Sequence, residues 1–317
     1  MMIRVSLTFV SCGKDLFALS VDFTLDEADN SCLHFFRSDN MFLDFLRRRS
    51  GQGSRASEFT PLFVAGAPRS GTTILHAIVC ASRKTNGYIN ECSYFTGLLH
   101  PLLVGLDTFD VHTKHYFPSR DAFTTHHAEV LRKELHRIWQ YTGSHEILAL
   151  KDPMLTPLIP HVAKVLPETR FIVSVRDPRA TISSRIEVLK RETQGRVVTD
   201  AQIQAFCAEY VHMYGTIANS LSDLEGRLLL VDYRDVVNGE VFEKLEAFNL
   251  GNIDAEAIWA DTIADPTPSA NDPWATLLHG KKPSVASVYR YREVLDDRTE
   301  QLIMDACGSV ARVLGAI

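Results

Sequence analysis

The segment from Pro61 to Leu75 constrains the fold more than any other part of this chain of 317 residues. It begins with an apolar run, continues through Gly66 and Gly71, and ends in an apolar stretch. This order predicts a buried strand, a tight glycine turn and the first turns of a helix. Such a turn aims several backbone N–H groups at one point, which is how many proteins bind phosphate. The sequence therefore predicts an α/β protein with a phosphate-binding loop at residues 66–73.

The side chains of this loop argue against binding of ATP. Its glycine spacing is that of a P-loop, and Thr73 occupies the Ser/Thr position. ATP-binding loops carry at position 72 the lysine that reaches the β- and γ-phosphates, but this chain has Thr72, and the cation of its loop is Arg69. We therefore expect a donor with a single 5′-phosphate that carries one further group. A P-loop NTPase or small-molecule kinase is the alternative, with Asp232 as its metal-binding acid.

A second candidate phosphate anchor follows the mostly apolar run 171–175, which predicts a strand covered on both faces. Arg176 comes directly after this strand. Asp177 and Pro178 then predict the N-cap and first position of a helix. Ligands of open parallel sheets bind at the carboxyl ends of the strands. We therefore expect Arg176 to contact the ligand, with the hydroxyl of Ser184 gripping the same phosphate from two turns into the helix.

Taken together, these two segments resemble the sulfotransferases that use 3′-phosphoadenosine 5′-phosphosulfate (PAPS). The loop beginning at Pro68 resembles the family's 5′-phosphosulfate loop, and the stretch beginning at Arg176 resembles its 3′-phosphate motif. An arginine at position 69 is typical of the branch that includes the tyrosylprotein and many bacterial sulfotransferases. The resemblance covers residues 60–240 well and 280–317 weakly. It implies a P-loop-type parallel β-sheet with helices on both faces, PAPS as the donor, PAP as the released nucleotide, and no metal.

The resemblance also implies catalytic roles for three residues. Arg69 and Lys151 would stabilise the transferred sulfuryl group, and Glu91 would act as the general base. A carboxylate is a weak base at its ordinary pKa of ~4.3, so we expect neighbouring aromatic and aliphatic side chains to bury Glu91 in part. His112 or His115 is the rival base, because other sulfotransferases use histidine.

Further contacts to the donor are expected from the loop, the 3′-phosphate motif, a tyrosine after a later strand and a segment near the C-terminus. These residues are Ser70, Gly71, Thr72, Thr73, Arg176, Ser184, Tyr233, Ser284, Ser287 and Arg290, in addition to Arg69.

The composition narrows the class of partner and the compartment. A net charge of −6 argues against a nucleic-acid-binding protein. The six cysteines are dispersed without metal-ligand spacing, which indicates neither a zinc site nor a disulfide framework and suits a reducing compartment. Lys14 and Asp15 interrupt the first apolar stretch, so we expect neither a signal peptide nor a membrane anchor, and we interpret the chain as a cytoplasmic enzyme.

The organisation of the chain suggests an N-terminal extension, 1–55, and a sulfotransferase domain, 56–317. Within the domain, the helical or irregular insertion 86–145 is rich in histidine and aromatic residues, and we assign it to acceptor binding. We favour a hydroxyl or amine of a small molecule of secondary metabolism as acceptor, because an acidic chain is a poor partner for acidic peptides. A protein-tyrosine acceptor and a non-catalytic PAP-binding module are the alternatives, and the oligomeric state is left open, a homodimer included.

The hydrophobic periodicity predicts strands alternating with helices. A strand pair or a disordered start is left open for 1–30. Strands are expected at 61–66, 146–150, 171–175 and 227–231, and helices at 40–49, 71–82, 127–141, 157–166, 178–191, 201–224, 242–248, 254–259 and 300–314.

Overall fold

The computed structural model of the chain describes residues 6–8, 20–22, 58–254, 256, 258 and 284–317. The chain divides into two compact units, 1–56 and 57–317. In the first unit, β1 (Ser6–Thr8) pairs antiparallel with β2 (Ser20–Asp22). The helix predicted at 40–49 lies outside the described residues. The second unit holds every residue that the sequence assigns to the site.

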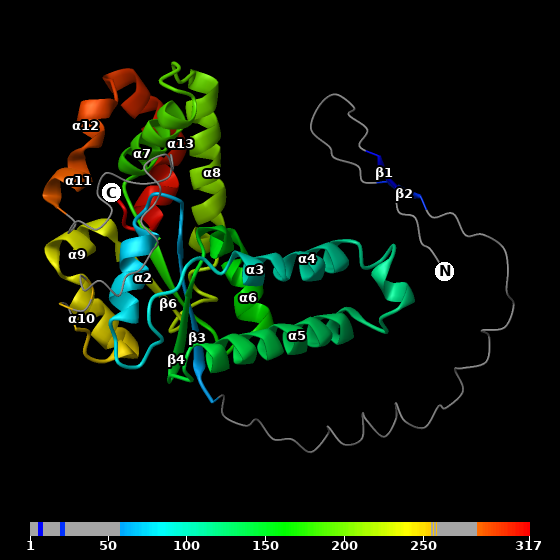
Figure 1. Ribbon diagram of the computed structural model, residues 1–317. Coiled ribbons are helices and arrows are strands. Elements are labelled where there is room, and N and C mark those ends of the chain that lie inside the picture. Colours follow the sequence, from blue (N-terminus) through cyan, green and yellow to red (C-terminus); the bar gives the residue numbers. More distant parts are fainter. Residues whose placement is uncertain (1–5, 9–19, 23–57, 255, 257, 259–283) are drawn as a thin grey trace, which may run out of the picture. The chain divides into compact units, whose positions relative to one another are not determined.

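The centre of the second unit is a parallel sheet whose four strands have the order β4-β3-β5-β6 (Figure 1). The strands are β3 (Thr60–Gly66), β4 (Ile147–Lys151), β5 (Arg170–Val175) and β6 (Leu228–Asp232). Each lies within one residue of its predicted range, so the predicted parallel α/β fold is confirmed. Because β4 lies on one side of β3 and β5 on the other, the order of the strands reverses at β3. Ligands of open α/β sheets bind at such a reversal, beyond the carboxyl ends of the strands.

Helices cover both faces of this sheet, as predicted (Figure 1). On one face lie α2 (Thr72–Cys80), α9 (Tyr233–Asn238), α10 (Val241–Leu245) and the π-helical turn η3 (Glu246–Leu250). On the other lie α5 (Arg120–Tyr141), α6 (Ile159–Val165), α7 (Pro178–Glu192), α8 (Asp200–Ala218) and α13 (Asp297–Val313).

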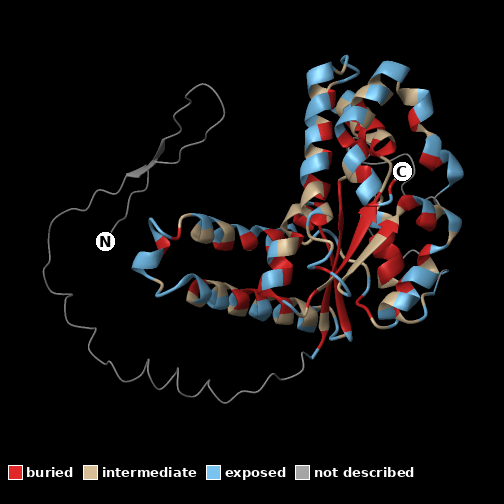
Figure 2. Cartoon of the chain, turned by 180° about the vertical axis from the view of Figure 1, so that it is seen from behind, coloured by how far each residue is buried: buried red, intermediate tan, exposed pale blue. Residues whose placement is uncertain are grey.

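Alternation along the strands supplies both cores. Phe63 and Phe171 pack into the larger core, whereas their neighbours Val64 and Ile172 pack into the smaller one on the opposite face. Successive side chains of a strand point to opposite faces, so a strand that is apolar at every position must be covered twice. Figure 2 shows β3, β4 and β5 almost wholly buried, β6 mostly of intermediate burial, and the outer faces of the helices exposed.

The insertion 86–145 is more helical than the sequence pattern indicated. It contains α3 (Ser93–Gly97), α4 (Leu99–Asp107), the 3-10 turn η1 (Thr113–His115) and α5. The helix predicted at 127–141 begins at Arg120, because the Ser119 side chain caps it by accepting a hydrogen bond from the Ala122 N–H. Helices α4 and α5 extend side by side away from the sheet (Figure 1).

Two further predicted helices differ from the observed ones at their ends. The helix predicted at 157–166 is preceded by η2 (Pro153–Leu158), which begins early because Asp152 accepts a hydrogen bond from the Met154 N–H. The helix predicted at 201–224 ends at Ala218 and gives way to turns that reach Gly226.

Three helices near the C-terminal end were not expected at their observed positions. The capping box of Asp232 and Asp235 starts α9 directly after β6. Helices α11 (Val285–Tyr289) and α12 (Tyr291–Val294) precede α13. The helix predicted at 254–259 lies largely outside the described residues. Within the described part of the chain, no helix has both the length and the apolar character needed to cross a membrane.

Candidate functional site

The carboxyl ends of the four strands bring the predicted site residues to one edge of the sheet. Gly66 ends β3 and opens the loop, and Lys151 is the last residue of β4. Arg176 follows β5, and Tyr233 follows β6. The parallel register places these four strand ends together, since ligand-binding groups of such sheets gather at the carboxyl edge.

Close packing requires glycine at both ends of the loop. Gly66 has φ 140° and Gly71 has φ 99°, the left-handed region that side chains disfavour. A Cβ at Gly66 would lie 2.5 Å from the Ser174 carbonyl oxygen, and one at Gly71 would lie 2.6 Å from Cδ2 of Tyr233. Helix α2 begins directly after Gly71, so the N–H groups of its first turn have no intrahelical acceptor. This geometry can bind an anion.

The hydroxyls of the loop are less available than the sequence predicted. Ser70 and Thr72 are buried, whereas Thr73 is exposed. Both buried side chains pack beneath the loop against Gly66, which is why they do not reach its surface. Of these three residues, Thr73 is therefore the one with an accessible hydroxyl, and the Ser70 N–H donates to the Ala67 carbonyl oxygen.

Arg176 connects the loop to the C-terminal segment. Its Nη1 donates to the Arg69 carbonyl oxygen over 2.9 Å, and its Nη2 donates to the Ser287 carbonyl oxygen over 2.6 Å. Its guanidinium carbon lies 4.4 Å from the centre of the Tyr233 ring. The enclosed Nε has no hydrogen-bond partner among the described residues. Desolvation lowers the pKa of Arg176. The positive charge of this desolvated side chain favours an anion nearby.

Arg69 lies at the same end of the site. Its backbone has φ 73°, and its Nε donates to Ser184 Oγ over 3.1 Å. Desolvation, followed by the charges of Arg191 and Arg176, lowers the pKa of Arg69 to about 10, so the side chain is still a cation at neutral pH. Several positive charges thus lie near Arg69.

A second group of candidates surrounds Lys151, which is buried. Its Nζ lies 3.1 Å from Glu91 Oε1 and 3.4 Å from Thr73 Oγ1. The Cys92 N–H donates to the Lys151 carbonyl oxygen over 2.8 Å, which holds the Glu91 segment against the end of β4. Asp152 does not pair with Lys151 and accepts from Thr96 instead. The predicted catalytic residues therefore lie in two groups: Arg69 contacts Ser184, which is predicted to bind the donor, whereas Lys151 contacts Glu91.

The Glu91 side chain is only half-buried. Its side chain is 47 % exposed, and the neighbouring Tyr94 is 66 % exposed. The extended segment before α3 turns this carboxylate outward, toward solvent and Lys151. The rival bases, His112 and His115, lie in the connection between α4 and α5, at the end of that pair that points away from the sheet (Figure 1).

The C-terminal candidates differ in their contacts. Ser287 is buried, and its hydroxyl lies 3.0 Å from the Tyr233 hydroxyl. Ser284 is exposed, and its carbonyl oxygen accepts from the Ser287 hydroxyl. Arg290 pairs with Glu187 on α7 over 2.8 Å. Ser287 therefore belongs to the group around Arg176, whereas Arg290 ties this segment to α7.

Two buried hydroxyl groups beneath the loop were missed in the sequence. Thr156 Oγ1 accepts a hydrogen bond from the Gly66 N–H over 2.8 Å. The hydroxyl of Tyr214 accepts one from the Ala67 N–H over 3.0 Å. In the sequence, Tyr214 is indistinguishable from a core aromatic of an amphipathic helix. Among the described residues, no group of three or more His, Cys, Asp or Glu side chains could hold a metal ion.

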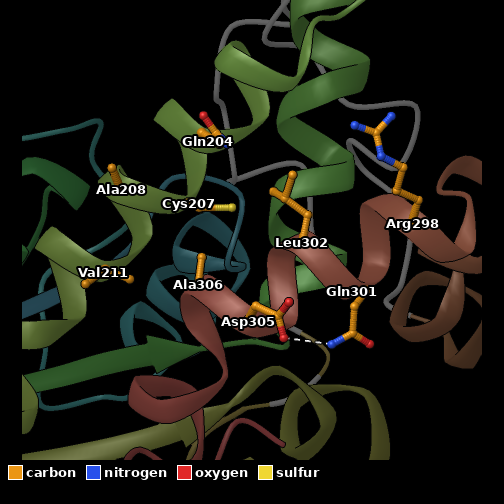
Figure 3. A pocket seen from close by; sticks show the side chains of 9 residues that line it. All are labelled: Gln204, Cys207, Ala208, Val211, Arg298, Gln301, Leu302, Asp305 and Ala306. Carbon is orange, nitrogen blue, oxygen red and sulfur yellow. Dashed lines mark hydrogen bonds between the residues drawn. The ribbon is translucent and has the colours of Figure 1, made fainter.

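A separate groove lies between α8 and α13 and has a volume of about 800 Å³ (Figure 3). Cys207 and Val211 line it from α8, and Leu302 and Asp305 line it from α13. None of the candidate residues above lines this groove, so it is not part of the candidate site.

Comparison with known proteins is consistent with this geometry. The model of the sulfotransferase family matches residues 61–243 of the chain. A Caenorhabditis briggsae protein provisionally named a protein-tyrosine sulfotransferase is 32% identical over 133 residues. This match covers 40% of the chain and 42% of the relative, so the chain matches less than half the length of that protein.

Solved structures share the fold at low sequence identity. The sulfotransferase domain from the curacin biosynthetic pathway superposes with a TM-score of 0.52 at 13% identity, over 78% of this chain and 96% of that domain. The sulfotransferase domain of the Synechococcus PCC 7002 olefin synthase gives a TM-score of 0.48 at 16% identity, over 80% and 98% of the two chains. At 13% identity, the similarity to the curacin-pathway domain shows the fold alone.

Proposed function

The chain belongs to the sulfotransferase family, and from this premise we propose that it transfers a sulfuryl group from PAPS to a hydroxyl or amine of a small molecule and releases PAP. The observation that carries the proposal is the 2.9 Å hydrogen bond from Arg176 Nη1 to the Arg69 carbonyl oxygen. It joins the phosphate-binding loop to the arginine at the end of β5. The two groups that we assign to phosphate binding therefore lie next to each other, as a nucleotide with phosphates at both ends of its ribose requires.

The residues present fit such a nucleotide. The first turn of α2 offers unpaired N–H groups for the 5′-phosphate. We assign the 3′-phosphate to the desolvated cation of Arg176 and to the Ser184 hydroxyl, which lies beside the loop cation Arg69. Tyr233 lies under the Arg176 guanidinium and would flank the ribose or base.

The second group of residues suits the transfer step. When bound, PAPS supplies the sulfuryl group, which passes to the acceptor oxygen or nitrogen as the bond to the 5′-phosphate breaks. Lys151 is a buried cation at the end of β4, and it would stabilise negative charge on the transferred sulfuryl group. Glu91 is accessible and would take the proton from the acceptor. The 3.1 Å contact between them would hold the carboxylate in place.

The kinase alternative requires a metal-binding acid that the structure does not provide at Asp232. The carboxylate of Asp232 accepts from the Arg234 N–H over 2.6 Å and pairs with the Arg234 guanidinium over 2.7 Å. It is thus occupied as the N-cap of α9. Thr72, in place of the P-loop lysine, argues in the same direction.

A protein-tyrosine acceptor is the second candidate, and the C. briggsae relative favours it. Against it stands the net charge of −6, since acidic peptides bind to basic grooves. We further propose a cytoplasmic enzyme of secondary metabolism, on the basis of the dispersed cysteines and the small-molecule acceptor.

Thermal shift tests the donor. We expect PAP without Mg²⁺ to raise the melting temperature, and Mg-ATP at the same concentration to leave it unchanged. The variant Arg176→Ala should lose the response to PAP, whereas Arg137→Ala, a surface arginine of α5, should keep it. Stabilisation by Mg-ATP alone would contradict the proposal and support the kinase.

A transfer assay tests the acceptor. Labelled PAPS is incubated with panels of small alcohols, phenols and amines, and separately with acidic tyrosine peptides. Label on a small molecule supports our proposal, and label on the peptides alone supports the protein-tyrosine enzyme. Firm PAP binding without transfer to any acceptor would identify a non-catalytic nucleotide-binding module.

A further inference from the structure

Helix α8 presents two buried tyrosines to the underside of the candidate site. Tyr210 and Tyr214 lie one helical turn apart and are 2 % and 0 % exposed. Their rings meet edge to face, with centroids 4.7 Å apart. Each hydroxyl reaches the main chain next to one of the two phosphate anchors. We call Tyr210 and Tyr214 the tyrosine pair.

Tyr214 supports the loop. Its hydroxyl donates to the Ser174 carbonyl oxygen over 2.7 Å and accepts from the Ala67 N–H over 3.0 Å. Ser174 in turn donates its own hydroxyl to the Ser70 carbonyl oxygen over 2.8 Å. The first half of the loop is therefore fixed to the end of β5 through one tyrosine oxygen.

Tyr210 supports the other anchor. Its hydroxyl donates to the Arg176 carbonyl oxygen over 3.0 Å, at the residue where β5 has ended and α7 has not begun. Desolvation raises the pKa of Tyr214 to about 12 and raises that of Tyr210 further. Both hydroxyls therefore stay protonated and can donate at any pH near neutrality.

We propose that the tyrosine pair are positioning residues that set the separation between the 5′-phosphate loop and the 3′-phosphate arginine. Tyr214 positions the loop, and Tyr210 positions the backbone from which the Arg176 guanidinium extends. The inference rests on the proposed function, because it assumes a nucleotide that carries both phosphates. It makes Tyr210 a determinant of specificity for the 3′-phosphate, although it contacts no ligand.

Calorimetric titration of the full chain with PAP and with adenosine 5′-monophosphate tests this division. We expect Tyr210→Phe to weaken PAP binding about tenfold and to change 5′-monophosphate binding less than twofold, because only PAP uses the 3′ anchor. Tyr214→Phe should weaken both ligands by about tenfold, because both use the loop. The matched control is Leu131→Val, a buried position on α5, which should lower the melting temperature without changing either affinity.

The outcomes separate the possible failures. If Tyr210→Phe lowers the melting temperature but keeps the wild-type ratio of PAP to 5′-monophosphate affinity, the tyrosines serve stability only and the inference is wrong. If Tyr214→Phe does not fold, the ratio measured for Tyr210→Phe still decides the matter. A wild-type protein that binds no PAP would overturn the proposed function, and this inference with it.

Discussion

Arg69 and Ser184 are 115 positions apart in the sequence, yet Arg69 Nε donates a hydrogen bond to Ser184 Oγ over 3.1 Å. The cation of the phosphate-binding loop is thus held by the hydroxyl of the predicted 3′-phosphate motif. Both residues are only partly buried, so a phosphate can approach the pair from solvent. This contact links the two halves of the proposed nucleotide site within one hydrogen bond.

Removal of the Ser184 hydroxyl should separate nucleotide binding from stability. We expect Ser184→Ala to weaken PAP binding by roughly tenfold to a hundredfold, because it removes a hydrogen bond between the hydroxyl and a charged phosphate. The neighbouring Ser183 is buried and donates to the Ala180 carbonyl oxygen, which makes Ser183→Ala a matched control. Calorimetric titration with PAP checks the prediction, and equal affinities of the two variants would contradict it.

Replacement of the exposed carboxylate beside Lys151 should affect turnover and not binding. We expect Glu91→Gln to lower the rate of sulfuryl transfer by about 10²–10⁴-fold, because general-base catalysis contributes about that much. Its affinity for PAP should be unchanged, since Glu91 contacts Lys151 and not the phosphate anchors. Glu134→Gln, on α5, is the control.

The same assay decides between Glu91 and the histidines. His112→Ala and His115→Ala should keep near-normal turnover, because both lie in the connection between α4 and α5. If one of them abolishes transfer while Glu91→Gln remains active, the general base is that histidine.

A methyl group at Gly71 should disrupt the site because it would overlap with the Tyr233 ring. We expect Gly71→Ala to weaken PAP binding more than tenfold, because its Cβ would lie 2.6 Å from the Tyr233 ring in addition to the strain at φ 99°. Gly226 also has a positive φ, 72°, but open space around it, so Gly226→Ala isolates the strain. Melting temperature and PAP titration of both variants check this. Equal losses of PAP affinity would mean that the contact with Tyr233 is irrelevant.

The buried His76 should make stability depend on pH. Desolvation lowers its pKa from 6.5 to about 3, and the charge of Lys151 acts in the same direction, against the hydrogen bond to the Ala149 carbonyl oxygen. Between these two pKa values the unfolded chain binds a proton that the folded chain does not bind. The contribution of neutral His76 is therefore full above pH 6.5 and falls as the pH falls toward 3.

Urea unfolding at pH 7.5 and pH 5 measures this dependence. Wild type should lose about 2 kcal/mol more unfolding free energy between the two pH values than His76→Gln, since 1.5 pH units below the unfolded pKa correspond to about that amount. Identical losses in the two proteins would show that His76 is not neutral in the folded state.

The sequence was sufficient for those features that depend on neighbours along the chain. The run before Gly66, the cap at Asp177 and the proline after it are local signals, and β3, β5 and α7 lie where they predict. Strand ends in a parallel sheet share an edge, so the presence of Arg176 at the ligand edge also followed from the sequence.

Only the tertiary structure decided what each side chain meets there. The Cys92 N–H binds the end of β4 and so holds the Glu91 segment there, and Arg69 contacts Ser184 because α7 packs beside the loop. Tyr214 reaches the Ala67 N–H across 147 positions of sequence. Periodicity encodes which face of an element is buried, whereas the partner of a buried polar group depends on how distant elements pack, and no local pattern specifies that.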